Sequence, residues 1–70
     1  MAVSYSRLWK LLIDHKMSAA DIRKSAGIAP NTMTKLRRDE PVNLAILGRI
    51  CHVLGCDYGD IVEYIDEPPA

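Results

Sequence analysis

The stretch from Gly27 to Glu40, GIAPNTMTKLRRDE, carries short polar and basic side chains at the spacing of one helix face. With Asn31 at 0° on a helical wheel, Lys35 falls at about 40° and Arg38 at about 340°. Thr34 follows at about 300°. An Asn amide can bond adenine twice, a Lys can donate to guanine acceptors, and a Thr can bond a base or touch a thymine methyl. These side chains predict a helix that enters the major groove of DNA.

The opposite side of the same helix is apolar. Leu36 and Met33 fall at about 140° and 200° on this wheel, so they would anchor the helix to the rest of the protein. The guanidinium groups of Arg37 and Arg38 suit DNA phosphates. The alternative interpretation of this segment is a solvated helix in a small bundle, whose polar face has no ligand.

A short helix is predicted just before this one. Ser18 begins it as the N-cap, and Asp21, three residues on, makes a variant of the capping box. Gly27 is a natural residue to end it, and Pro30 suits the first position of the next helix. The connection between the two helices is therefore the three residues 27–29. Two short helices joined by a tight turn containing Gly predict a helix-turn-helix.

Two further apolar patterns predict helices on either side of this pair. The first helix is expected from about Ser4 to Lys16, with Ser4 or Ser6 as its N-cap. Its apolar stripe is wider than one core face needs and comprises Leu8, Leu11, Leu12, Tyr5, Trp9 and Ile13. The fourth helix is expected to start after its N-cap Asn43 and to close at Gly55. Its inward residues are expected to be Leu44, Leu47, Cys51 and Leu54.

A fifth helix is predicted at the end of the chain, capped by Asp57 with Asp60 at capping-box spacing. Its apolar side is expected to consist of Ile61, Val62 and Ile65. No stretch alternates apolar and polar residues over several positions, so no strand is predicted. The expected fold class is all-α, a compact five-helix bundle formed by residues 4–65. A disordered C-terminal tail is expected at residues 66–70.

Charge is unevenly distributed along the chain, although the formal net charge is zero. All nine basic residues fall within residues 1–56, together with four acidic ones. Residues 57–70 hold the other five acidic residues and no base. Between Ile22 and Arg38 there are five basic residues and no acidic one. A basic surface around the helix-turn-helix is therefore expected, as binding to a polyanion requires.

The composition is that of one globular domain, with 70 residues of which 49% are hydrophobic and 26% charged. No apolar run is long enough for a membrane span or a signal peptide. We therefore expect a cytoplasmic protein that makes no membrane contact. In that compartment Cys51 and Cys56 are expected to be reduced.

Residues 4–65 resemble the phage-repressor-type helix-turn-helix family, also called the xenobiotic-response-element family. The resemblance rests on MSAADIRKSAGIAPNTMTKLRRDE and on the following VNLAILGRICHVLGCDYGDIVEYI. The capping residue, turn glycine and apolar anchors of the family pattern would be Ser18, Ile22, Gly27, Ile28, Met33, Leu36, Leu44, Leu47 and Leu54. The resemblance implies a lambda-repressor-like DNA-binding domain. It also implies one of the very short regulators that consist of this domain and little else.

By this resemblance, base contacts would come from Pro30, Asn31, Thr32, Thr34 and Lys35. Phosphate contacts are expected from Ser18, Arg23, Arg37, Arg38 and Asn43. Ala19 stands where family members often carry a phosphate-binding Gln, and Arg23 stands where they favour a small residue. Ala29 occupies the place of a capping Ser or Thr, so the third helix is expected to lack a side-chain cap at its start.

Sites for other chemistry are not expected. Cys51, His52 and Cys56 are close in sequence, but a zinc site needs four ligands and no fourth lies nearby. The chain has no phosphate-cradling glycine loop and no credible Ser-His-Asp order. We therefore expect no cofactor, no effector pocket and no enzymatic activity.

The sequence thus predicts a regulator, acting as a repressor, that binds double-stranded DNA sequence-specifically through residues 30–38. The predicted partner is a second copy, because one small domain covers few base pairs. The dimer contact would be a patch formed by Tyr5, Trp9, Ile13, Ile61, Tyr64 and Ile65. Acidic residues would rim and weaken it: Asp60, Glu63, Asp66 and Glu67. The alternative function is a protein-interaction module, such as an antitoxin or an anti-regulator.

Overall fold

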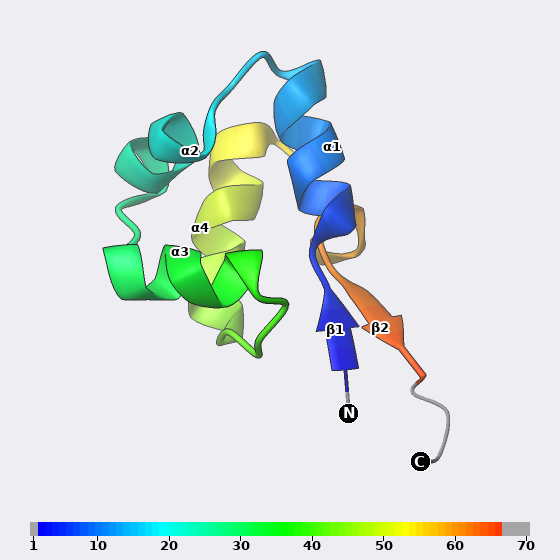
Figure 1. Ribbon diagram of the computed structural model, residues 1–70. Coiled ribbons are helices and arrows are strands. Elements are labelled where there is room, and N and C mark those ends of the chain that lie inside the picture. The colour runs from blue at the N-terminus through cyan, green and yellow to red at the C-terminus, as the bar shows by residue number, and fades with distance from the viewer. Residues whose placement is uncertain (1, 67–70) are drawn as a thin grey trace.

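The computed structural model describes residues 2–66, which form four α-helices, a 3₁₀ turn and a two-stranded sheet (Figure 1). In chain order the elements are β1 (Ala2–Ser4), α1 (Ser6–Asp14), α2 (Ala19–Ala26), α3 (Pro30–Arg37), α4 (Leu44–Leu54), η1 (Tyr58–Asp60) and β2 (Glu63–Ile65). The predicted compact helical fold is confirmed. The predicted fifth helix and the predicted lack of strands are wrong.

Capping residues determine where α2 begins and ends. The Ser18 hydroxyl oxygen accepts a hydrogen bond from the Asp21 N–H at 3.1 Å, and the Asp21 carboxylate accepts one from the Ser18 N–H at 2.9 Å. This is the predicted capping box, and the hydrogen bonds from Ser18 lower the pKa of Asp21. At the other end Gly27 has a φ of 65°, the left-handed conformation that ends many helices.

The caps of α4 are as predicted, but its inward face is different. The Asn43 amide oxygen accepts a hydrogen bond from the Ile46 N–H at 2.9 Å, and Gly55 ends the helix with a φ of 64°. The buried residues are Leu47, Ile50, Cys51 and Leu54. Leu44 is 63% exposed, because it is the first residue of α4, where the apolar stripe continues beyond the packed core.

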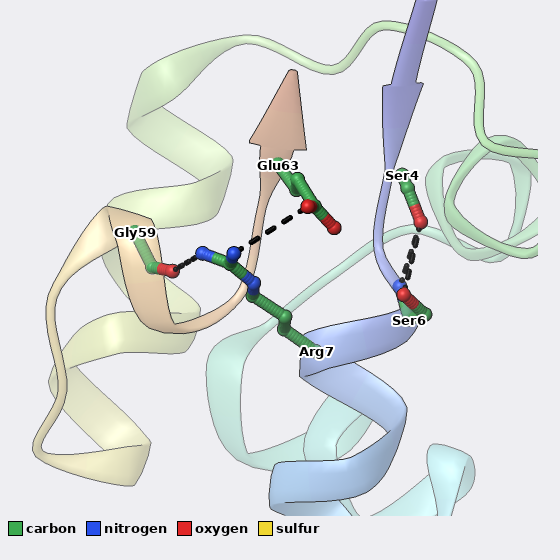
Figure 2. Close-up of polar contacts among 5 residues, drawn as sticks. All are labelled: Ser4, Ser6, Arg7, Gly59 and Glu63. Atoms are coloured by element: carbon green, nitrogen blue, oxygen red, sulfur yellow. Dashed lines mark hydrogen bonds and ion pairs between the residues drawn. The ribbon is translucent and has the colours of Figure 1, made fainter. Parts of the chain in front are cut away.

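The first helix, α1, begins later than predicted because the chain before it is extended. Ser4 belongs to β1, and Tyr5 is the N-cap residue, so the prediction that Ser4 or Ser6 caps the helix is wrong. The Ser4 hydroxyl oxygen accepts a hydrogen bond from the Ser6 N–H at 3.2 Å, where β1 meets α1 (Figure 2). The helix ends at Asp14, and Lys16 lies in the turn that follows.

The turn η1 and the strand β2 replace the predicted fifth helix. Asp57 and Asp60 do form the predicted capping box, but the turn ends at Asp60. The chain then extends and pairs antiparallel with β1, with Tyr64 opposite Val3. The β-branched residues of this segment favour an extended backbone, and β1 supplies the partner strand that makes it stable.

Arg7 of α1 holds this end of the chain in place. Its guanidinium group donates to the Gly59 carbonyl at 2.9 Å and lies 3.4 Å from the Glu63 carboxylate (Figure 2). Both side chains of the ion pair are about half exposed, so the pair adds little stability. The hydrogen bond to Gly59 joins η1 to α1, and the buried Ile61 packs the residue after η1 into the core.

One core is built from all four helices and from residues beside them. Its largest fully buried side chains are Tyr5, Leu8, Ile22, Leu36, Ile50 and Ile61. Burying one such side chain contributes about 1.5–3 kcal/mol to stability. Because Ile22 and Leu36 belong to this core, α2 and α3 are fixed to the same interior. Residues 67–70, most of the predicted tail, lie outside the described residues.

Candidate nucleic-acid interface

The turn between α2 and α3 is the three-residue connection that the sequence predicts. The Ile28 N–H donates to the Arg23 carbonyl at 2.9 Å, and the Ile28 side chain is buried in the core. The turn is therefore fixed both by a backbone hydrogen bond and by packing. Figure 1 shows α2 and α3 as neighbouring short helices joined by this turn, which is the arrangement of a helix-turn-helix.

The third helix, α3, has a solvent face and a core face. Met33 and Leu36 are buried as predicted, and Ala29 provides no side-chain cap, also as predicted. Four of the predicted base-contact residues are exposed: Pro30, Asn31, Thr34 and Lys35. Thr32 is only partly exposed, so it lies at the edge of this face. The exposed face therefore presents amide, hydroxyl and ammonium groups together.

The polar side chains of α3 differ in the bonds they already make. The Thr34 hydroxyl donates to the Pro30 carbonyl at 3.2 Å, which leaves its methyl group and its oxygen lone pairs for a ligand. Within residues 2–66, the side chains of Asn31 and Lys35 make no hydrogen bond or ion pair. Both can therefore bond a base edge without breaking an internal contact.

Two arginines line a shallow groove between α2 and α3. Arg23 comes from α2 and Arg37 from α3, and Thr34 lies in the same groove. Arg23 is partly exposed and lines this groove, so an arginine in place of the usual small residue is accommodated at the surface. The ion pair found among residues 2–66 joins Arg7 to Glu63, so neither groove arginine has a carboxylate partner there. Two such guanidinium groups suit a phosphate.

The remaining predicted phosphate contacts lie at helix ends. Ser18 and Asn43 are exposed N-caps of α2 and α4, and each oxygen accepts a backbone hydrogen bond. The Ser18 hydroxyl proton and the Asn43 amide protons remain as donors. Helix N-termini also favour anions, since their first N–H groups point outward. Arg38 is the exposed C-cap residue of α3, beyond the end of the base-contact face.

The sequence does not predict the contacts that hold the loop after α3. The Tyr5 backbone N–H donates to the Asp39 carboxylate at 3.0 Å, and the Tyr5 hydroxyl donates to the Glu40 carbonyl at 2.8 Å. Tyr5 is 1% exposed, and this burial raises the pKa of its hydroxyl. The bonded residues are more than 30 positions apart, so no local pattern connects them.

The two cysteines meet where α4 ends. The Cys56 N–H donates to the Cys51 carbonyl at 3.0 Å, a backbone bond that brings the two side chains together, and both are free thiols. Burial, with Cys51 beside it, raises the pKa of Cys56 to about 11, so it is protonated at neutral pH. In the described part of the chain, no three His, Cys, Asp or Glu residues converge as a metal site.

An exposed polar and basic helix, fixed on a core and joined by a glycine turn to a preceding helix, defines a helix-turn-helix DNA-binding domain. The comparison with family models agrees, because residues 7–67 match the Cro/C1-type helix-turn-helix DNA-binding domain. The chain belongs to this family. The predicted resemblance to phage repressors is thereby confirmed.

A solved structure with the same architecture is the crystal structure of the transcriptional regulator VanUg, Form II. The two structures align with a TM-score of 0.91 and 45% sequence identity, over 94% of this chain and 88% of that chain. No curated protein matches the chain significantly. Among residues 2–66, every helix is too short or too polar to cross a membrane.

Proposed function

We propose that this protein binds double-stranded DNA sequence-specifically through α3 and acts as a transcriptional repressor. The observation that carries the proposal is the exposed face of α3, where the side chains of Asn31 and Lys35 make no hydrogen bond and the basic residues make no ion pair within residues 2–66. The likeness to VanUg supports a regulatory role, since that protein is a transcriptional regulator. A compact DNA-binding domain represses most simply by occupying a promoter and excluding the polymerase.

In this proposal the exposed face of α3 contacts the bases. Asn31 would bond adenine and Lys35 would donate to guanine. Thr34, whose hydroxyl is turned back to the helix, would present its methyl group to thymine. Pro30, at the start of the helix, and Thr32, at the edge of the face, would make the flanking contacts.

Phosphates would be held on both sides of the base contacts. Arg23 and Arg37 share one groove, so they would hold a phosphate between α2 and α3. Ser18 and Asn43 would donate beside the outward N–H groups of the helices they cap. Arg38 would hold a further phosphate beyond the end of α3. These contacts would fix the orientation of α3 on the duplex.

We also propose that two copies bind a two-fold-symmetric site as a weak homodimer. The apolar patch predicted for the contact is divided in the structure. Tyr5 and Ile61 are buried within one chain, and Ile13 lies near the end of α1 that is distant from β2 (Figure 1). Tyr64 and Ile65 of β2 remain exposed and are the proposed contact.

Selection from a pool of random duplexes, followed by mobility shifts, tests these proposals. We expect an inverted-repeat sequence that binds about a thousandfold or more tighter than unrelated DNA. Transcription from a promoter carrying this sequence should fall when the protein is present. Equal binding to every duplex would contradict sequence-specific recognition. Failure to retain DNA even at low salt would contradict DNA binding and favour the protein-interaction module instead.

A further inference from the structure

The loop after α3 contains an unusual backbone position. Asp39 has a φ of 55°, in the left-handed region where glycine is the usual residue. The Glu40 N–H donates to the Lys35 carbonyl at 2.9 Å, and the Asp39 N–H donates to the Leu36 carbonyl at 3.3 Å. This is a Schellman-type helix end with Asp in the glycine position. A second non-glycine residue, Lys16, has a φ of 56° after α1, so what distinguishes Asp39 is the hydrogen bond that its carboxylate accepts.

The carboxylate of Asp39 is used to bond Tyr5, at the junction of β1 and α1. Tyr5 holds the loop at two successive residues, through its N–H to Asp39 at 3.0 Å and through its hydroxyl to the Glu40 carbonyl at 2.8 Å. The Tyr5 side chain is itself fixed in the core. In Figure 1 the loop after α3 turns toward the junction of β1 and α1. We call Tyr5, Asp39 and Glu40 the latch.

The other attachments of α3 lie at its start and along its core face. Met33 and Leu36 bury the core face of the helix, and the buried Ile28 holds the turn before it, although Ala29 gives its start no side-chain cap. Base contacts need side chains held within about 0.5 Å and 10–20°, so the loop at the end of α3 must be fixed as well as its start and its core face. The latch fixes the far end, one residue beyond Arg38.

We propose that the latch is a positioning device that sets the tilt of α3 on DNA and thereby the specificity of base contacts. This rests on the proposed function, because it assigns a role within the same DNA-binding site. Electrostatics favours positioning over direct contact, since a carboxylate beside the basic end of α3 repels phosphates. Asp39 thus acts through the geometry of Lys35 and Arg38 rather than by touching DNA.

Three variants with the same change of charge separate geometry from electrostatics. Asp39→Gly suits the positive φ but removes the acceptor, whereas Asp39→Asn keeps an acceptor oxygen and tolerates this φ. Glu40→Gln removes a neighbouring charge and leaves the backbone carbonyl that Tyr5 bonds. Tyr5→Phe deletes the hydroxyl bond and keeps the aromatic packing.

The measured quantity is the ratio of affinities for the selected duplex and for unrelated DNA. We expect Asp39→Gly to lower this ratio about tenfold, the size of one impaired base contact. Tyr5→Phe should lower it less, and Asp39→Asn and Glu40→Gln should leave it near the wild-type value. Equal ratios for Asp39→Gly and Asp39→Asn would overturn the proposal. So would a lower melting temperature of Asp39→Gly with an unchanged ratio.

NMR of the DNA-free protein provides a readout that does not depend on DNA. In Asp39→Gly the amide signals from Lys35 to Glu40 should shift and the Tyr5 amide should exchange faster, while those of α2 stay in place. Asp39→Asn should preserve the wild-type pattern. Unchanged signals in Asp39→Gly would overturn the latch. A wild-type protein that binds no duplex would instead overturn the proposed function, and with it the role of the latch in recognition.

Discussion

Asn31 and Lys35 lie one turn apart on the exposed face of α3. Replacing either with Ala should weaken binding to the preferred sequence by about 1–3 kcal/mol, because hydrogen bonds to base edges carry the sequence information. The preference at one base position should relax at the same time. Fluorescence anisotropy with duplexes altered at single positions measures both effects. Equal losses on preferred and unrelated DNA, for both variants, would contradict a role in base contacts.

Arg38 should behave differently, because a phosphate contact is independent of sequence. Arg38→Ala should weaken binding to all duplexes alike and reduce the slope of log K against log salt by about one. Lys10→Ala is the matched control, since Lys10 lies on α1 in the groove formed with the end of α4. Titrations at several salt concentrations measure the slope. An unchanged slope for Arg38→Ala would show that this side chain points away from DNA.

At the scale of single residues, prediction from sequence succeeds where the interacting residues are close along the chain. The caps at Ser18 and Asn43 are predicted correctly because donor and acceptor lie three residues apart. The contact of Tyr5 with Asp39 is missed because nothing local connects the two residues. The burial of Tyr5 is missed for the same reason. The helical wheel places Tyr5 at the edge of the apolar stripe, but contacts with the loop after α3 bury it.

At the scale of elements, the end of the chain shows why local patterns can be insufficient. A short apolar segment such as residues 61–65 is compatible with a helix or a strand. The outcome depends on β1, at the other end of the chain, which pairs with Glu63–Ile65. By contrast α2 and α3 have caps, a turn glycine and an apolar anchor within their own sequence. The bounds of the helix-turn-helix were therefore predictable and the terminal sheet was not.

Gly48 lies within α4, where glycine lowers the stability of a helix. A Cβ there would lie 3.1 Å from the Tyr58 hydroxyl oxygen, which is the end of an exposed side chain held to Leu44 by one 3.4 Å hydrogen bond. The ring can shift, so Gly48→Ala should stabilise the protein by about 0.5–1 kcal/mol through helix propensity.

Gly27→Ala is the contrasting variant for the same measurement. A Cβ at Gly27 meets nothing within 4 Å, but its φ of 65° disfavours any L-side chain. This change should therefore destabilise by about 1–2 kcal/mol. Urea unfolding followed by circular dichroism compares the two variants. A destabilised Gly48→Ala would mean that Tyr58 is held more firmly than its exposure indicates.

At the scale of the whole molecule, charge is unevenly distributed: basic residues predominate in α2 and α3, although α2 also carries Asp21, and η1 and β2 carry only acidic charges. The basic residues of α2 and α3 lie on the left in Figure 1, and the acidic η1 and β2 lie on the right. Arg7 and Glu63 make the ion pair found in residues 2–66, and it belongs to the acidic side. We expect the field of DNA to orient such a molecule with α3 toward the phosphates. The zero net charge is therefore compatible with DNA binding.

The proposed homodimer would set the distance between two α3 helices. The molecule measures 38 × 23 × 19 Å, so two copies in contact can place their α3 helices about 34 Å apart, one turn of DNA. The acidic residue Glu63 lies in β2, and Asp60 and Asp66 lie close to it in sequence, so they would repel a second copy. DNA should overcome this repulsion by holding both copies, so we expect a micromolar or weaker dimer without DNA and a full dimer on the inverted repeat.

Sedimentation from micromolar to millimolar protein, with and without the inverted-repeat duplex, measures this assembly. Tyr64→Ser should shift the protein toward monomer and remove cooperative binding, because Tyr64 is 64% exposed on β2 and would become buried between the copies. Ile13→Ser is the matched control. Ile13 is 74% exposed near the end of α1 that is distant from β2, so this change should not alter assembly. A wild-type monomer at every concentration, binding one half-site without cooperativity, would exclude the dimer. A dimer disrupted by Ile13→Ser and not by Tyr64→Ser would instead place the contact on α1.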